Sequence, residues 1–176
     1  MEKNWMQLLQ DEKSLANILE TNQETEQYGL VLSEEDAKSL VAWRAKSLKE
    51  QKRVEFSGGI TEKLIREFCD SEYIGQEEYV EIIARLQDIF YLYKNEMMDE
   101  ITDDELLHVM KELFETVCFG DLEYLESTCL DHFARAIRAG YQEFRKTEGH
   151  GEGAKFVKVP RFDYDLFMQV LNELVE

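Results

Sequence analysis

Apolar residues recur every three or four positions through most of the chain, and this spacing predicts amphipathic α-helices rather than strands. The longest such pattern, over residues 77–98, would form about 33 Å of helix. A first helix is predicted over residues 4–20, whereas residues 21–29 are polar and predict a loop. The apolar face predicted for the first helix consists of Trp5, Leu8, Leu9, Ala16 and Leu19.

Two helix starts carry capping signals. Ser33 precedes three acids; its hydroxyl can accept a hydrogen bond from a free amide, and acids favour the positive end of the helix dipole. Thr102 and Glu105 have the spacing of a capping box. A break is predicted at residues 120–121, with a further helix over 122–144. The buried stripe predicted after Ser33 consists of Ala37, Leu40, Val41, Ala45 and Leu48.

The remaining segments have shorter patterns. Helices are predicted over residues 61–69 and 163–175, very short strands over 54–56 and 156–159, and a flexible glycine-rich loop near 149–153. Together these elements predict an all-α fold, a compact array of about seven helices with one or two very short strands. We expect a single helical domain over the whole chain, because 176 residues suffice to bury one sizeable core.

Composition narrows the class of protein. Hydrophobic residues make up 44% of the chain and include ten Phe, which argues for a packed core rather than an acidic disordered tail. No apolar run approaches the ~20 residues that would span a bilayer, and the N-terminal sequence lacks the pattern of a secretion signal. We therefore expect a cytoplasmic protein, in which Cys69, Cys118 and Cys129 are reduced thiols with a packing role.

Charge is distributed unevenly. The formal net charge is −18, and residues 94–131 hold twelve acids against two bases. Residues 44–55 have the opposite balance, and so do residues 132–161. The strong negative charge argues against general binding to nucleic acid or to an anionic membrane, whereas the segregation favours a partner with a complementary pattern.

Two segments carry a resemblance to a known family. They are RVEFSGGITEKLIREFCDSEYI and LQDIFYLYKNEMMDEITDDELLHVMKELFE. These segments resemble a family of uncharacterised bacterial proteins, found mainly in anaerobic clostridia, and the likeness extends over roughly residues 28–140. The family has no assigned activity, ligand or catalytic residue. The resemblance therefore implies a bacterial cytoplasmic protein and leaves its function open.

Glu105, His108 and Glu112 form the candidate metal site. They lie at i, i+3 and i+7 on the polar side of one predicted helix, and such a row of carboxylates and imidazole can bind Zn, Mn or Fe. Carboxylates from Glu96 or Asp99 would complete it. The alternative is a solvated helix face with a surface histidine, because the neighbouring leucines direct His108 outward.

Ser57, Gly58 and Gly59 form the candidate anion site. Backbone amides at a helix N-terminus can bind phosphate or carboxylate, and nearby Lys52, Arg53 and Lys63 would add positive charge. The alternative is a tight turn that uses the freedom of glycine to adopt positive φ.

The candidate partner-binding residues are in the basic stretch. A partly exposed Trp beside Arg is enriched in binding hot spots; the alternative is a Trp packed under a neighbouring helix. The residues are Trp43, Arg44, Lys49, Lys52 and Arg53.

The sequence contains no recognisable catalytic constellation and predicts no cofactor. We therefore interpret the chain as a non-enzymatic protein–protein interaction or adaptor module whose partner is another protein. The alternatives are a metal- or small-ligand-dependent enzyme that uses the carboxylate–histidine site, and an acidic mimic of nucleic acid. A small-molecule pocket lined by Phe90, Tyr93 and Phe133 is a further alternative.

Overall fold

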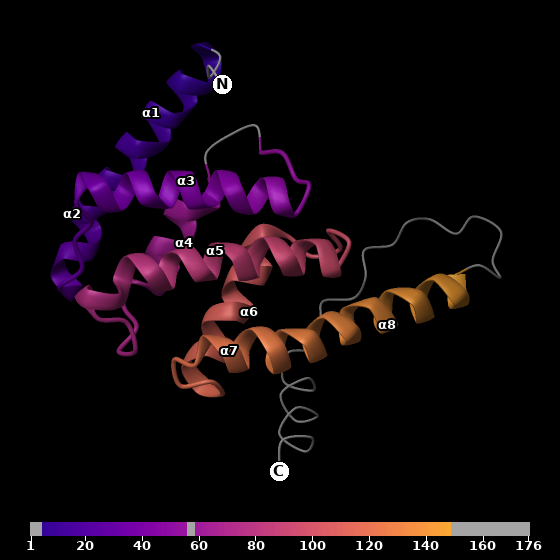
Figure 1. Ribbon diagram of the computed structural model, residues 1–176. Helices are drawn as coiled ribbons and strands as arrows, with labels where there is room; N and C mark the ends of the chain where they lie inside the picture. Colours follow the sequence, from indigo (N-terminus) through magenta and orange to yellow (C-terminus); the bar gives the residue numbers. More distant parts are fainter. Residues whose placement is uncertain (1–4, 56–58, 149–176) are drawn as a thin grey trace.

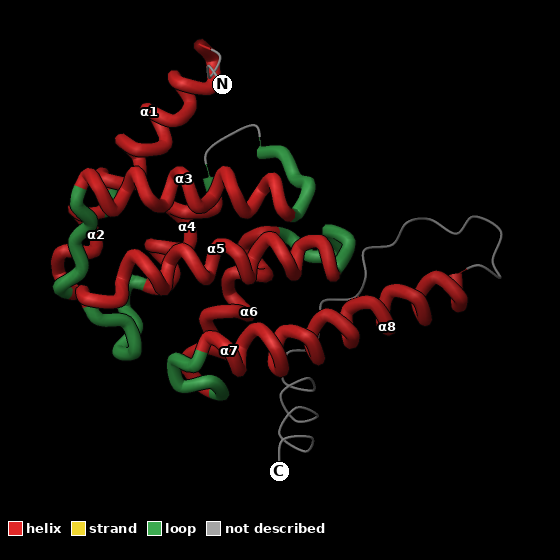
Figure 2. The backbone as a smooth tube through the Cα atoms, viewed as in Figure 1, coloured by secondary structure: helices red, strands yellow, loops and turns green. Residues whose placement is uncertain are grey.

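The computed structural model describes residues 5–55 and 59–148 (Figure 1). Six helices of nine residues or more lie within this part of the chain, joined by short helical turns (Figure 2). Glu26–Tyr28 and Gln76–Glu78 form 3₁₀ turns, and Leu125–Cys129 forms a π-helical turn. The α-helices are α1 (Trp5–Glu20), α2 (Asn22–Thr25), α3 (Glu34–Glu50), α4 (Ile60–Phe68), α5 (Tyr79–Glu96), α6 (Asp103–Thr116), α7 (Leu122–Tyr124) and α8 (Leu130–Glu148).

The all-α prediction is confirmed, with six substantial helices in the described residues rather than about seven. The strand predicted at 54–56 is wrong for its described residues, which are neither helix nor strand. The Glu55 side chain there binds Arg44 of α3 and Tyr91 of α5. The strand predicted at 156–159, the loop near 149–153 and the helix at 163–175 lie outside the described residues.

Helices α3 and α5 run side by side and form the centre of the molecule (Figure 1). Helix α4 packs against α5 and α6, and α8 lies on the side of α5 away from α3. The core between them is one continuous cluster of buried side chains. Its largest fully buried members are Tyr79, Tyr91, Phe68, Phe90, Phe114, Phe133, Ile18, Leu30, Leu40, Leu64, Ile65 and Ile83.

Helix α1 ends at Glu20 as predicted, but the segment that follows it differs from the prediction. The stretch predicted as a polar loop forms α2 and a 3₁₀ turn, because two buried threonines bond inside it. The Thr21 hydroxyl donates to the carbonyl of Ile18 at 2.6 Å, and the Thr25 hydroxyl donates to the carbonyl of Leu30 at 2.7 Å. These hydroxyls satisfy backbone acceptors locally, so a polar segment can be ordered and helical.

Helix starts follow the predicted capping. Ser33 accepts a hydrogen bond from the amide of Asp36 and the Asp36 carboxylate accepts one from the amide of Ser33, so α3 begins with a full capping box. Thr102 accepts from the amide of Glu105 at 3.1 Å at the start of α6. Both starts are therefore set by local sequence.

The connection between α5 and α6 is held by a buried lysine. Lys94 is 6% exposed; its Nζ donates to the carbonyl of Ile101 at 2.7 Å and forms an ion pair with Asp103 at 2.9 Å. Met98 and Asp99 have positive φ values of 52° and 58°, which lets the chain reverse beside this lysine. The lysine and the two left-handed residues together turn the chain from α5 into α6.

The connection from α6 to α8 begins with a second left-handed pair. Phe119 and Gly120 have φ values of 48° and 85°. A side chain at Gly120 would place its Cβ 2.6 Å from the Cβ of Tyr73, so glycine is required there by both conformation and space. The predicted break at residues 120–121 is confirmed, and α7, the π turn and α8 then follow without interruption.

Candidate interaction surface

Helix α3 turns one face towards α1. Lys38, Val41, Ala42 and Ala45 follow the i, i+3, i+4, i+7 spacing of a single helix face, and Lys49 continues it by one more turn. On the opposite side of the gap, α1 contributes Leu8, Asp11, Glu12 and Leu15. The groove has a volume of about 500 Å³ and lies between these four residues of α1 and the four residues of α3 from Lys38 to Ala45.

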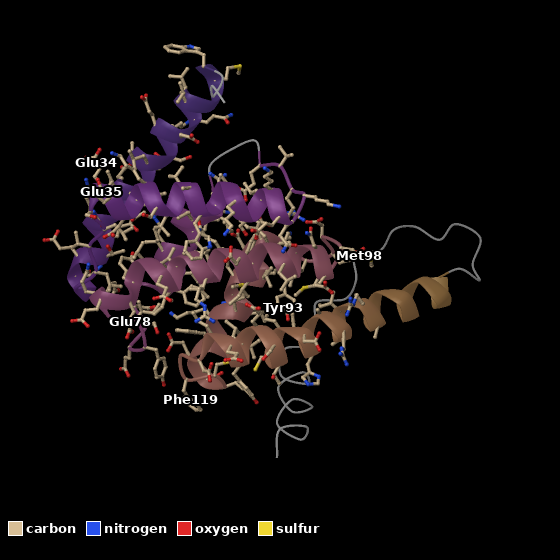
Figure 3. All side chains as sticks on the ribbon, in the orientation of Figure 1. Glu34, Glu35, Glu78, Tyr93, Met98 and Phe119 are labelled. Atoms are coloured by element: carbon tan, nitrogen blue, oxygen red, sulfur yellow. The ribbon has the colours of Figure 1, made fainter. Side chains whose placement is uncertain are left out.

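The floor of this groove is apolar and its rim is charged. Lys38 forms an ion pair with Glu34 at 3.4 Å, so the base in the groove is partly neutralised within α3. Asp11 and Glu12 supply carboxylates on the α1 side. Figure 3 shows Glu34 and Glu35 at the end of α3 beside α1, and both are exposed. The surroundings of the groove are therefore negative overall.

The apolar face of α1 is only partly covered. Its C-terminal half packs on the core through Leu15, Ile18 and Leu19. Its N-terminal half rises clear of the other helices (Figure 1), and there Trp5 is 74% exposed. Met6, Leu8 and Leu9 are also exposed. Periodicity places Trp5, Leu8 and Leu9 on one apolar face of this helix, and they are exposed because α1 extends beyond the helix it packs against.

The other side of α3 is bonded to α5 and to the chain after α3. The indole Nε1 of Trp43 donates to the Asp88 carboxylate at 2.8 Å, and the Trp43 side chain stays 40% exposed. The Arg44 guanidinium binds one oxygen of Glu55, and the Tyr91 hydroxyl donates to the other. Burial, together with the Glu55 charge, raises the pKa of the Tyr91 phenol.

The five candidate partner-binding residues do not lie on one face of the molecule. Arg53 donates to Asp99 at 2.8 Å and to Asn95 at 2.7 Å, and the bond from Arg53 lowers the pKa of the Asp99 carboxyl. Lys49 and Lys52 are exposed. Three of the five candidates, Trp43, Arg44 and Arg53, are therefore engaged in contacts within the chain.

The candidate anion site lies at the start of α4. Ser57 and Gly58 are outside the described residues, and Gly59 is the buried N-cap residue of α4. A Cβ on Gly59 would lie 2.8 Å from the Cζ of Arg44, so the guanidinium occupies the space beside the glycine. That guanidinium already forms an ion pair with Glu55, so the anion bound beside Gly59 is a carboxylate of the chain itself.

A buried polar group follows in the first turn of α4. Thr61 donates to the amide oxygen of Gln87, whose Nε2 has no partner among the described residues. Glu62 is 8% exposed, and burial raises the pKa of its carboxyl while Arg44 lowers it by a smaller amount. This cluster joins α3, α4 and α5 through polar side chains.

The candidate metal residues all lie on α6. Glu105 and His108 are exposed and Glu112 is half-buried. Among residues 5–55 and 59–148 no group of three or more His, Cys, Asp or Glu side chains is placed to hold a metal ion. The carboxylates proposed to complete the site are paired elsewhere, Glu96 with Arg138 at 3.3 Å and Asp99 with Arg53.

The aromatic side chains considered as a pocket lining are core residues. Phe90, Tyr93 and Phe133 are at most 5% exposed, and the Tyr93 hydroxyl donates to the carbonyl of Glu126. A second hollow lies between α5 and the start of α7, and it is polar and mainly acidic. It is lined by Glu78, Glu81, Ile82, Arg85, Gly120, Asp121, Leu122 and Glu123.

A family model described as "Family of unknown function (DUF6323)" matches residues 17–143. The chain belongs to this family. The resemblance to a family without assigned activity is thus confirmed, and the matched region contains all of α3 but begins within α1. Neither the curated proteins nor the solved structures yield a match. No helix in the described part of the chain has the length and apolar character needed to cross a membrane.

Sequence reasoning missed the groove because its lining looks like core. The sequence predicts Val41 and Ala45 in the buried stripe of α3 and Leu8 on the apolar face of α1. Periodicity finds an apolar face but does not tell which part of it another helix covers.

Proposed function

We propose that this protein is a non-enzymatic interaction module, and that the groove between α1 and α3 docks a helix of another protein. The observation that carries the proposal is the exposed continuation of an apolar face. The stripe that packs on the core at Leu15 and Leu19 continues to Leu8 and Trp5, where no described residue covers it. An unpartnered apolar face of this kind is typical of sites that bind a helix.

The chemistry of the partner follows from the shape and charge of the groove. Its alanines, Ala42 and Ala45, leave room for large side chains of an opposing helix. Glu12, Glu34 and Glu35 make the surroundings negative. The partner helix should therefore present apolar residues at i, i+3, i+4 and i+7 and carry Lys or Arg beside them.

Of the predicted basic contacts, Lys49 belongs with this surface by helical phase. It follows Ala45 by one turn on the same face of α3 and is exposed. Lys49 at one end and the acids at the other would orient the bound helix, because charge complementarity sets register and encounter rate more than affinity.

A site-specific photo-crosslinker tests the surface. It is placed at Leu8 in the full chain and, as a matched control, at Val54, which is 73% exposed elsewhere on the molecule. We expect one protein adduct of defined mass from position 8, carried by a basic amphipathic helix, and none from position 54. The Ala45→Glu variant should reduce the adduct, because it places a carboxylate and extra volume in the groove.

Three results would overturn the proposal. Equal adduct yields from the two positions would indicate random collision with exposed apolar side chains. An adduct between two copies of this chain would make the occupant the protein itself. An adduct on an acidic or non-helical segment would contradict the chemistry proposed for the partner.

A further inference from the structure

Two cysteines meet between α6 and α8. Cys118 lies two residues after the end of α6, and Cys129 is the last residue of the π turn. Their Sγ atoms are 3.5 Å apart, and the two side chains are 5% and 0% exposed. The third cysteine, Cys69, bonds through its Sγ to the carbonyl of Arg66 at 3.4 Å.

The backbone on each side fixes the position of the sulfur atoms. The amide of Cys118 donates to the carbonyl of Leu113 at 2.8 Å, and its carbonyl accepts from Asp121 at 3.0 Å. The left-handed residues Phe119 and Gly120 close this turn, and Figure 3 shows Phe119 at its outer edge. The cysteine is thus held by main-chain bonds before and after it.

The π turn aligns the second sulfur. A π-helix accommodates one more residue per turn than the α-helix, so the phase of the residues that follow shifts by about 100°. Cys129 stands at the end of Leu125–Cys129, where this shift is complete. The direction of its side chain towards Cys118 therefore depends on the irregular turn.

The two sulfur atoms differ in their chemistry. The hydrogen bond that the two thiols share raises the pKa of the Cys118 thiol and lowers the pKa of the Cys129 thiol. The thiolate is the nucleophilic form of cysteine, so this direction favours Cys129 as the attacking sulfur and Cys118 as the second thiol. Burial raises the pKa of the Cys69 thiol, and its Sγ bonds to the backbone rather than to a second sulfur, so Cys69 serves as the comparison.

We propose that Cys118 and Cys129 form a reversible modification site, which a small hydroperoxide converts into an intramolecular disulfide. The inference is independent of the docking groove. The S–S distance must shorten by about 1.5 Å, from 3.5 Å to the length of a disulfide bond, which rotation of the two side chains can supply.

The reaction proceeds in two balanced steps. The Cys129 thiolate attacks one oxygen of hydrogen peroxide; the O–O bond breaks, and hydroxide leaves and takes up a proton as water, giving a sulfenic acid. The Cys118 thiol then attacks the sulfenic sulfur, the S–O bond breaks and a second water leaves. The two thiols are oxidised to one disulfide while the peroxide is reduced to two water molecules.

The bond would join the end of α6 to the start of α8. The two cysteines are eleven residues apart in sequence, so the disulfide closes a short loop around Phe119, α7 and the π turn. Cross-links that close short loops restrict the unfolded chain, and we expect a melting temperature higher by about 5 °C in the oxidised protein.

Peptide mapping of the full chain tests the proposal directly. Trypsin leaves both cysteines in one peptide, residues 112–135, and Cys69 in another, residues 67–85. The folded protein is treated with millimolar hydrogen peroxide, blocked with N-ethylmaleimide and digested. We expect the peptide 112–135 to be unalkylated and lighter by two hydrogens, and dithiothreitol to reverse this change. The peptide 67–85 should be alkylated.

Variants make the outcome unambiguous. Cys69→Ser should leave the yield of the disulfide unchanged, whereas Cys118→Ser should leave a sulfenic acid at Cys129 that dimedone traps. Full alkylation of both cysteines after peroxide would overturn the proposal, as would sulfinic acid in place of the disulfide. A disulfide that includes Cys69 would also overturn it, because the pairing would then not follow the geometry of the folded protein.

Discussion

The two sides of α3 use their side chains in opposite ways. Towards α5, polar and charged residues are saturated: Trp43 binds Asp88, and Arg44 binds Glu55. Towards α1, the lining is mostly apolar and is left open to solvent as a groove. The tryptophan and arginine that the sequence suggested as binding residues thus stabilise the fold. The apolar residues that the sequence placed in the core line the open groove and remain free to contact a partner.

This inversion has a simple physical origin. An arginine or tryptophan near the surface binds a carboxylate that the fold brings close. Both carboxylates here, Asp88 and Glu55, come from segments outside α3. An apolar stripe is buried only where a second element runs alongside it. Because α1 extends beyond its contact with α3, the apolar stripe of α1 continues past the last residues that another helix covers.

The largest effect should come from removing the central charge on the α5 side. Arg44→Ala leaves Glu55 mostly buried without its cation, and we expect a loss of about 3 kcal/mol in the free energy of unfolding. The control is Lys46→Ala, because Lys46 forms an ion pair with exposed Glu50 on the same helix; this variant should lose less than about 1 kcal/mol. Urea denaturation of both variants measures the difference; equal losses would show that the two kinds of charge are equivalent.

A smaller effect is expected at Glu62, the buried carboxyl beside Arg44. Its raised pKa means that the folded state holds the proton more tightly than the unfolded state. Stability is therefore lost as pH rises from the unfolded pKa through the folded pKa. Glu62→Gln removes this loss, so the variant should melt higher than the parent at pH 7 and show little difference at pH 4.

Melting curves across that pH range check the sign. The matched control is Glu67→Gln, since Glu67 lies on the same helix and is only half-buried. A Glu62→Gln variant that melts lower than the parent at pH 7 would mean that the ionised carboxylate contributes to stability through Arg44.

The smallest effect on stability is expected in the groove. Ala45→Glu changes an exposed residue of the α1 side, and the free energy of unfolding should stay within about 0.5 kcal/mol of the parent. Its effect should appear instead as loss of the crosslink from Leu8. A large destabilisation by Ala45→Glu would show that the α1 side is structural, and would remove the contrast between the two sides of α3.

The helices themselves could be predicted well from the sequence. Ser33 and Thr102 mark the starts of α3 and α6 because capping depends on residues three positions apart. Helix α5 was evident because its apolar residues repeat over its whole length. Both signals are local, and local signals are present in the sequence without knowledge of the fold.

Contacts between distant segments could not be predicted in the same way. The pairing of Arg44 with Glu55 and Tyr91 depends on the packing of α3 against α5. The meeting of Cys118 and Cys129 depends on a π turn that no residue pattern announces. The exposed end of α1 depends on where its neighbour stops, which periodicity does not reveal.

The buried Lys94 has a consequence for the variation that the family can accept. Its side chain reaches from α5 to the carbonyl of Ile101, so the number of residues between them is limited by the length of one lysine. An inserted residue would move that carbonyl away and leave an ammonium buried without its acceptor. Relatives that keep a lysine at this position should therefore keep this connection at constant length, and relatives that have lost the lysine are free to lengthen it.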